Sequence, residues 1–94
     1  MRLRFYVDPE TGAPHIYKHG LSESEVEEVL ANAAEDRAGR DGTRIAIGRS
    51  LSGRLLRVIY VPDPQPDSSF VITGFEVQGK AALAYRRRRR RRQR

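Results

Sequence analysis

The sequence predicts an α+β fold in which one main helix packs on a three- to four-stranded, mostly antiparallel sheet. Three observations lead to this prediction. One segment carries a helix-capping signature with an apolar stripe, several runs rich in β-branched and aromatic residues are bounded by glycine or proline, and arginines crowd the C-terminus. Ninety-four residues suffice for one domain. We therefore expect a single domain over residues 1–85 and a basic C-terminal tail over residues 86–94.

The chain opens with a short expected strand. Residues 3–7 are mainly apolar and aromatic, and residues 8–12 that follow are turn formers, since Pro9 presets φ and Gly12 permits a positive φ. Residues 13–18 form either an extended segment or a single helical turn, and periodicity does not separate these two alternatives.

The main helix is predicted over residues 23 to about 35. Ser22 followed by Glu25 is a capping box, and Leu21 and Val26 occupy the positions of a hydrophobic staple. The apolar residues repeat at helical spacing: Val26, Val29, Leu30 and Ala33. We expect this stripe to face the sheet.

A β-hairpin is predicted after the helix. Residues 36–42 are polar with two glycines and are expected to form a loop, whereas residues 43–49 and 54–61 are rich in strand-forming residues. The four residues 50–53 have the length and composition of a hairpin turn. Because both faces of 54–61 are largely apolar, we expect it to be a central strand.

Three prolines end this hairpin, since Pro62, Pro64 and Pro66 exclude a strand across residues 62–67. Residues 70–77 form the next expected strand. Residues 80–85 are good helix formers that continue directly into the arginines.

The charge of the chain is concentrated in its tail. The chain carries 18 Lys and Arg against 12 Asp and Glu, a net charge of +6, but eight of the basic residues lie at 86–92 and 94, so residues 1–85 sum to −2. Guanidinium groups at this density favour a polyanion, since each can bridge two phosphate oxygens. We expect the tail to bind RNA, the ribosome or an acidic protein; the alternative is a disordered solubilising tail or an artificial tag. The predicted nucleic-acid-binding residues of the tail are Arg86, Arg87, Arg88, Arg89, Arg90, Arg91 and Arg92.

Several classes of protein are excluded or disfavoured by composition. The chain has no cysteine, which excludes a disulfide partner and a cysteine zinc site and suits the reducing cytosol. The longest uninterrupted apolar run is five residues, so neither export nor a membrane partner is expected, and we predict a cytoplasmic protein. No cofactor is predicted.

Two histidines are candidates for acid–base chemistry. His15 and His19 are four residues apart and would share a face of a helix, where one imidazole could deprotonate an RNA 2′-hydroxyl while another group protonates the leaving oxygen. Pro14 before them and Gly20 after them leave barely one turn for such a helix. The alternative is that both are polar residues leading into the main helix. A metal site on two histidines would lack a third ligand.

The body also carries scattered cations: Lys18, Arg37, Arg40, Arg44, Arg49, Arg54 and Arg57. If Arg44, Arg49 and Arg54 converge on the sheet, they would stabilise the charge of a phosphorane-like transition state, with Tyr60 as a further phosphate donor. The alternative is that these arginines pair with the helix acids Glu23, Glu27 and Glu28. The sequence does not decide between the two.

Three local patterns of the sequence resemble one known family. Residues 18–25 read Lys-His-Gly-Leu-Ser-Glu-Ser-Glu, which resembles the Lys-His-Gly-Val-Ser entry to the helix of BrnT-type toxins from bacterial type II toxin–antitoxin pairs. Asp8, in the segment after an aromatic residue, resembles the early Trp-Asp of the family, and residues 47–50 with 53–56, Val58 and Tyr60 resemble its central hairpin. The resemblance implies a RelE-like fold, metal-independent RNA cleavage and a neutralising antitoxin partner. Where the family typically reads Ile-Ser-Ala-Arg, residues 72–75 read Ile-Thr-Gly-Phe, so the expected arginine is missing.

Two functions follow as expectations. The first is a toxin-like endoribonuclease acting on mRNA at or near the ribosome, with His19, Arg49 and Arg54 as catalytic residues and with Lys18, Arg44 and the arginine tail as RNA-binding residues. The second is a non-catalytic binding module of the same fold, whose arginine tail binds nucleic acid or an acidic partner.

Overall fold

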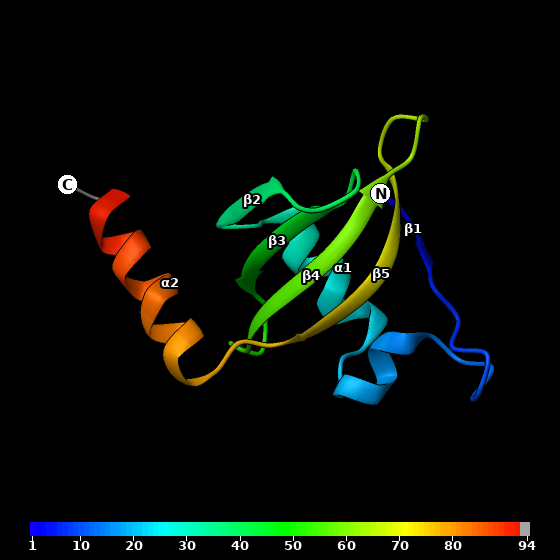
Figure 1. Ribbon diagram of the computed structural model, residues 1–94, viewed down its shortest axis with the longest axis horizontal. Helices are drawn as coiled ribbons and strands as arrows, with labels where there is room; N and C mark the ends of the chain where they lie inside the picture. The colour runs from blue at the N-terminus through cyan, green and yellow to red at the C-terminus, as the bar shows by residue number, and fades with distance from the viewer. Residues whose placement is uncertain (93–94) are drawn as a thin grey trace.

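Five strands form one mixed sheet in the order β1-β5-β4-β3-β2 in the computed structural model, which describes residues 1–92 (Figure 1). The strands are β1 (Arg2–Phe5), β2 (Glu35–Ala38), β3 (Arg44–Arg49), β4 (Leu55–Pro62) and β5 (Ser68–Glu76). The helices are the 3₁₀ helix η1 (His15–His19), α1 (Glu23–Ala31) and α2 (Gly79–Arg92). The predicted α+β class is confirmed, although the sheet has more strands than the three or four expected.

The main helix begins where the sequence predicts. The backbone N–H of Glu25 donates to Ser22 Oγ at 3.1 Å, and the Glu25 carboxylate accepts from the Ser22 N–H at 3.1 Å, which completes the capping box. Val26 and Val29 are fully buried against the sheet, with Leu30 and Ala33 partly buried beside them. The predicted apolar stripe is therefore the face that packs.

The helix ends at Ala31, earlier than predicted, because the chain then joins the sheet as β2. The N–H of Ala34 donates to the Ile47 carbonyl at 2.9 Å, and Glu35 lies opposite Ile47 in register. Gly48 permits this approach, since a Cβ there would lie 3.3 Å from the Cα of Ala33. The expectation of a loop beginning at residue 36 is wrong for residues 36–38, which belong to β2.

The hairpin and the central strand are confirmed. β3 and β4 pair antiparallel with Arg49 opposite Leu55, and the turn between them includes Gly53 at φ 91°. β4 lies at the centre of the sheet. β4 ends at Pro62 and β5 begins at Ser68, so the proline-rich segment forms the connecting loop, at the top of Figure 1.

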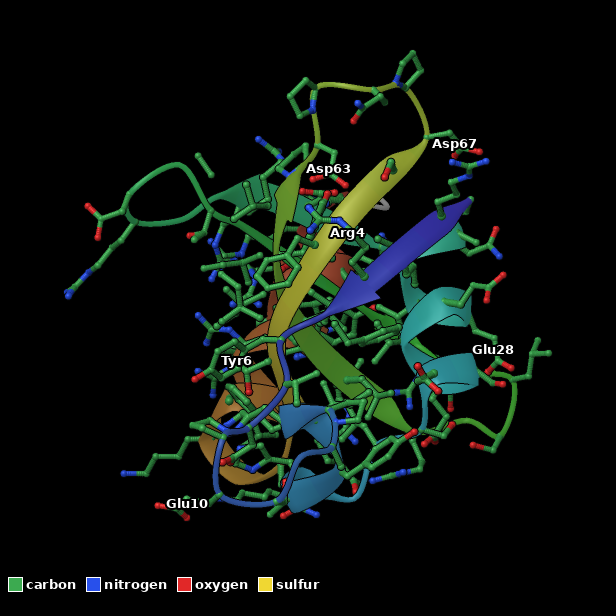
Figure 2. The ribbon with its side chains drawn as sticks, turned by 90° about the vertical axis from the view of Figure 1, so that its right-hand side faces the viewer. Arg4, Tyr6, Glu10, Glu28, Asp63 and Asp67 are labelled. Atoms are coloured by element: carbon green, nitrogen blue, oxygen red, sulfur yellow. The ribbon has the colours of Figure 1, made fainter. Side chains whose placement is uncertain are left out.

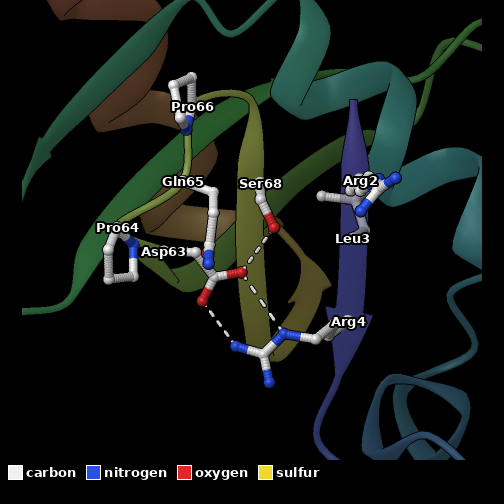
Figure 3. A pocket seen from close by; sticks show the side chains of 8 residues that line it. All are labelled: Arg2, Leu3, Arg4, Asp63, Pro64, Gln65, Pro66 and Ser68. Carbon is white, nitrogen blue, oxygen red and sulfur yellow. Dashed lines mark hydrogen bonds and ion pairs between the residues drawn. The ribbon is translucent and has the colours of Figure 1, made fainter.

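β1 is the short strand expected over residues 3–7, and it pairs with β5 as a parallel edge strand, with Phe5 opposite Val71. Arg4 on β1 reaches the proline-rich loop, where its Nη2 donates to Asp63 at 2.5 Å and lowers the pKa of that carboxyl (Figures 2 and 3). Ser68 Oγ donates to the same carboxylate at 2.6 Å. The three side chains line an open pocket of about 710 Å³, and their hydrogen bonds hold the N-terminal strand against the loop.

The two helices pack on opposite faces of the sheet, as Figure 2 shows. On the first face, α1 and η1 cover the larger core: Ile16, Leu21, Val26, Val29, Ala46, Leu56, Val58, Tyr60 and Val71. On the second face, α2 covers a smaller core: Ile47, Leu55, Val77, Ala82 and Tyr85. Much of the second face, including Arg57 and Phe75, is only partly covered.

The arginine run is helical, because α2 continues through Arg92 beside the β2 edge of the sheet (Figure 1). Arginine is a good helix former, and cations in the last turns complement the negative end of the helix dipole. Tyr85 is buried, Arg88 Nε donates to Glu35 at 2.8 Å, and Arg92 Nη1 donates to the Ala34 carbonyl at 3.2 Å. The expected tail over 86–94 is therefore the docked end of a helix as far as Arg92, and its last two residues, 93–94, lie outside the described residues. Within residues 1–92, no helix has the length and apolar character to span a membrane.

Glu35 is the anchor of α2, and replacing it with alanine is expected to destabilise the fold. Its side chain is buried and also faces Arg37 at 3.5 Å, so the carboxylate neutralises cations from two elements. Loss of this acceptor is expected to lower the free energy of unfolding by about 1–3 kcal/mol, measured by urea denaturation. Glu27→Ala removes an exposed carboxylate from α1 and serves as the control. Equal stability of the two variants would show that Glu35 does not anchor the helix.

Candidate functional site

The two histidines lie on η1, a single turn held at both ends. Pro14 precedes it, Gly20 follows at φ 74° with its N–H bonded to the Tyr17 carbonyl at 3.1 Å, and Ile16 is buried in the first core. Of the two alternatives for residues 13–18, the single turn is therefore right. It brings the rings of His15 and His19 into edge-to-face contact, with centroids 5.3 Å apart.

A buried carboxylate orients one of these imidazoles. Asp8 is 5% exposed and accepts from Lys18 Nζ at 2.8 Å and from the Glu10 backbone N–H at 2.9 Å. The Lys18 hydrogen bond, followed by the backbone bond, lowers the pKa of Asp8 to about 2. His15 Nδ1 lies 3.2 Å from Asp8 Oδ2, so an ionised Asp8 assigns the proton to Nδ1 and leaves Nε2 as the free nitrogen.

The histidines belong to a continuous row of flat side chains, which we call the ring row. Tyr6 and His15 have centroids 6.1 Å apart, His19 and Phe75 6.2 Å apart, and the guanidinium of Arg57 lies 5.8 Å from the centre of the Phe75 ring. The row crosses from the segment after β1, where Figure 2 labels Tyr6, through η1 to β5 and β4. It combines two imidazoles with two aromatic faces for stacking and with a guanidinium that has no hydrogen-bond or ion-pair partner among residues 1–92.

Arg54, a predicted catalytic residue, is neutralised by carboxylates. Its Nη1 donates to Glu25 at 2.9 Å and to the Gly20 carbonyl at 3.0 Å, and its Nη2 donates to Glu76 at 3.2 Å. The carboxylates raise the pKa of Arg54, with Glu76 contributing most. These contacts join the start of β4 to the η1–α1 junction and to the end of β5. Arg54 thus holds three elements of the fold together through its guanidinium.

The other predicted cations do not gather around the histidines. Arg44 and Arg49 are five residues apart at opposite ends of β3, about 17 Å along the strand, so the convergence of Arg44, Arg49 and Arg54, which the sequence left open, is absent. Arg44 Nε donates to Asp36 at 2.7 Å, and exposed Arg49 donates to the Gly53 carbonyl at 2.9 Å.

Two further predicted donors are engaged by carboxylates. Lys18 supports the histidine site indirectly through Asp8. The Tyr60 hydroxyl donates to Asp36, and burial together with this bond raises the pKa of Tyr60 to about 12. These acids are not the helix acids that the alternative named, because Asp8 precedes η1 and Asp36 lies on β2.

The arginines of α2 divide into two sets. Arg88 and Arg92 bind the sheet and the segment before β2, and Arg89 is half-buried. Four arginines are exposed and make no hydrogen bond or ion pair to any residue in 1–92: Arg86, Arg87, Arg90 and Arg91. At 100° per residue these four fall within one sector of about 140° of the helix, in which Arg87 and Arg91 lie opposite the buried Tyr85 and Ala82. They form one cationic face, which we call the arginine face.

Sequence reasoning placed His15 beside His19 but missed the groups that make the pair a site. The spacing of Asp8 and Lys18 gave no sign of their contact, because the turn formed by residues 8–12 brings them together. Arg57 was one cation among seven, and its place over Phe75 follows from the register of β4 and β5, in which these two residues lie opposite each other.

No group of three histidines, aspartates or glutamates within residues 1–92 is arranged to hold a metal ion.

Asp8 makes the stability of the protein depend on pH in the acid range. Its folded-state pKa lies below its unfolded value, so its contribution is complete above about pH 4 and is lost as the pH falls towards 2. The stability difference between the wild-type protein and Asp8→Asn is therefore expected to shrink over this interval, measured by urea denaturation. Asp41→Asn, at an exposed turn, is the control and is expected to show no such change. A difference that stays constant down to pH 2 would contradict the assignment.

Comparisons with protein-family models, with curated proteins and with solved structures found no match to this chain.

Proposed function

We propose that this protein is a metal-independent endoribonuclease acting on single-stranded RNA, of the toxin type that its sequence resembles. The observation that carries the proposal is the contact between His15 and His19 with His15 fixed by the buried Asp8. Two imidazoles are sufficient for RNA cleavage. One removes the proton of the 2′-hydroxyl as that oxygen attacks phosphorus, and the other protonates the departing 5′-oxygen, leaving a 2′,3′-cyclic phosphate.

The contacts of each histidine support a different role in this proposal. His15 is the general base at Nε2, because the ionised Asp8 stabilises the imidazolium that forms when His15 takes the proton. His19 is exposed and next to it, so it is the general acid. Arg57 lies beyond Phe75 and would stabilise the extra negative charge of the phosphorane. The resemblance expects an arginine at position 75 on β5, where this chain has Phe75. In this proposal Arg57, which lies opposite Phe75 on β4, takes the place of that arginine.

The arginine face of α2 supports binding of the RNA backbone. Four exposed guanidinium groups on one side of a helix attract phosphates without reading sequence, which suits a long polyanion such as mRNA or ribosomal RNA. The same face would accept an acidic antitoxin. In this proposal α2 holds the substrate and the histidine pair cleaves it.

A second function is favoured by a specific observation. Lys18, Arg44 and Arg54 are each paired with carboxylates, so the cations predicted for a catalytic site on the body are engaged internally. A non-catalytic module would need only the arginine face, which is not engaged. In that case the protein binds RNA or an acidic partner and leaves it intact.

Incubating the purified protein with a fluorescently labelled single-stranded RNA in excess EDTA separates the two functions. We expect cleavage products that end in 2′,3′-cyclic phosphate, and no cleavage of the same sequence made with 2′-deoxynucleotides. Binding without cleavage would favour the second function. Cleavage of the deoxy substrate would contradict the mechanism, because that substrate has no internal nucleophile.

A further inference from the structure

A groove runs between α2 and the second face of the sheet, next to the ring row. It encloses about 440 Å³, a volume in the range of small-molecule sites. Ile47 and Val77 form its sheet side, and Ala81 and Ala84 form its helix side. Because alanine side chains are small, a flat apolar group has room between the helix and the sheet.

Arg57 lies in this groove without a partner. It stands opposite Ile47 on β3 and opposite Phe75 on β5, on the face that the groove exposes. Its guanidinium makes no hydrogen bond or ion pair with any residue in 1–92, and its Nε is also screened from solvent. A half-buried cation without an acceptor is costly, and an anion entering the groove would satisfy it.

The charge of the groove is positive. Arg37 and Arg88 also line it, and the buried Glu35 is the acceptor for both, with Arg88 the closer partner at 2.8 Å. The remaining carboxylate on the lining, Glu76, is occupied by Arg54 at 3.2 Å. The lining therefore carries three guanidinium groups, of which Arg88 is held by Glu35, so Arg57 and the more weakly held Arg37 are left for a bound anion.

We propose that this groove is a nucleotide subsite, in which the base of an RNA residue next to the cleaved bond lies between Phe75 and the alanines of α2 while its phosphate contacts Arg57 and Arg37. A nucleotide consists of a flat ring linked to an anionic phosphate. The groove matches it, because an apolar slot lies next to the arginines on its lining. The inference rests on the proposed function for the identity of the ligand as RNA. It goes further by naming a place where one base is bound.

Titration of the ¹⁵N-labelled full chain with adenosine 5′-monophosphate, followed by NMR, tests the subsite. We expect shifts of the amides of Val77, Ala81 and Ala84, and affinity at least about tenfold lower in Arg57→Ala and in Ala84→Leu, which fills the slot. Ribose 5-phosphate, which has no base, is expected to bind about tenfold more weakly than the nucleotide. Arg2→Ala is the matched control, because it removes one guanidinium from β1, at the far edge of the sheet.

The outcomes separate the two claims. Inorganic polyphosphate, which also lacks a base, is expected to bind Ala84→Leu as it binds the wild-type protein, since the arginine face is unchanged. Unaltered nucleotide binding in Ala84→Leu, or equal binding of ribose 5-phosphate, would overturn the subsite, as would an acidic peptide that shifts the groove amides when the nucleotide does not. Nucleotide binding in the groove of a protein that cleaves no RNA would overturn the proposed function and leave the subsite standing.

Discussion

Replacing His15 with alanine is expected to reduce kcat for cleavage of single-stranded RNA by about 10²–10⁴-fold, because the general base is removed while the fold is kept. His15 is a quarter exposed, so its loss leaves little empty space in the core. Binding is expected to stay within a few-fold of wild type, since the arginine face is untouched. Single-turnover cleavage at saturating protein measures the chemical step, and fluorescence anisotropy in the absence of turnover measures binding.

Tyr17→Phe is the matched control for this change. Tyr17 lies on the same 3₁₀ turn, is 48% exposed, and its hydroxyl contacts Glu23 at 3.1 Å. The variant is expected to cleave at the wild-type rate. Asp8→Asn should fall between the two, because it leaves the imidazole in place but removes the charge that stabilises its protonated form. Wild-type cleavage by His15→Ala would remove His15 from the mechanism.

The second large effect is expected on the arginine face. Changing Arg86, Arg87, Arg90 and Arg91 together to glutamine should weaken binding of single-stranded RNA by about 10²–10³-fold near 0.1 M salt, because about 0.7 counterion is released per phosphate contact. For the same reason, the slope of log affinity against log salt should become shallower by about 3. Fluorescence anisotropy over a series of salt concentrations measures both quantities.

The variant is designed to keep α2 folded and docked. Glutamine has a helix propensity close to that of arginine, and Arg88 and Arg92 keep their contacts to Glu35 and Ala34. Circular dichroism verifies the helix. Arg2→Gln removes one exposed arginine from β1 and is expected to leave the slope unchanged. An unaltered slope in the fourfold variant would show that the arginine face does not contact the RNA.

The local parts of the fold were predictable from the sequence. The capping box of Ser22 and Glu25, the stripe on α1 and the turn at residues 50–53 each depend on residues within a few positions of one another. β2 was missed because it depends on Gly48 admitting the chain after α1, a contact between segments. The docking of α2 was missed for the same reason, since Glu35 and Arg88 are 53 positions apart.

In the candidate site, too, local features were predictable from the sequence and contacts between distant segments were not. The spacing of His15 and His19 is local and indicated a possible pair. The acids that neutralise Arg44 and Arg54 come from β2, α1 and the end of β5, so the sequence left open whether those arginines were free. The proximity of Arg57 to Phe75 is a consequence of strand register, which hydrophobic patterning sets across the whole sheet.

The central claim is that His15 and His19 act as the base and the acid of one reaction, and the pH dependence of kcat/KM for RNA cleavage tests it most directly. The wild-type protein in EDTA is predicted to give a bell-shaped profile, because one imidazole must be neutral and the other protonated. The residual activities of His15→Ala and His19→Ala are each predicted to lose one limb, the acid limb in the first and the alkaline limb in the second. A bell that persists unchanged in both variants would contradict the account.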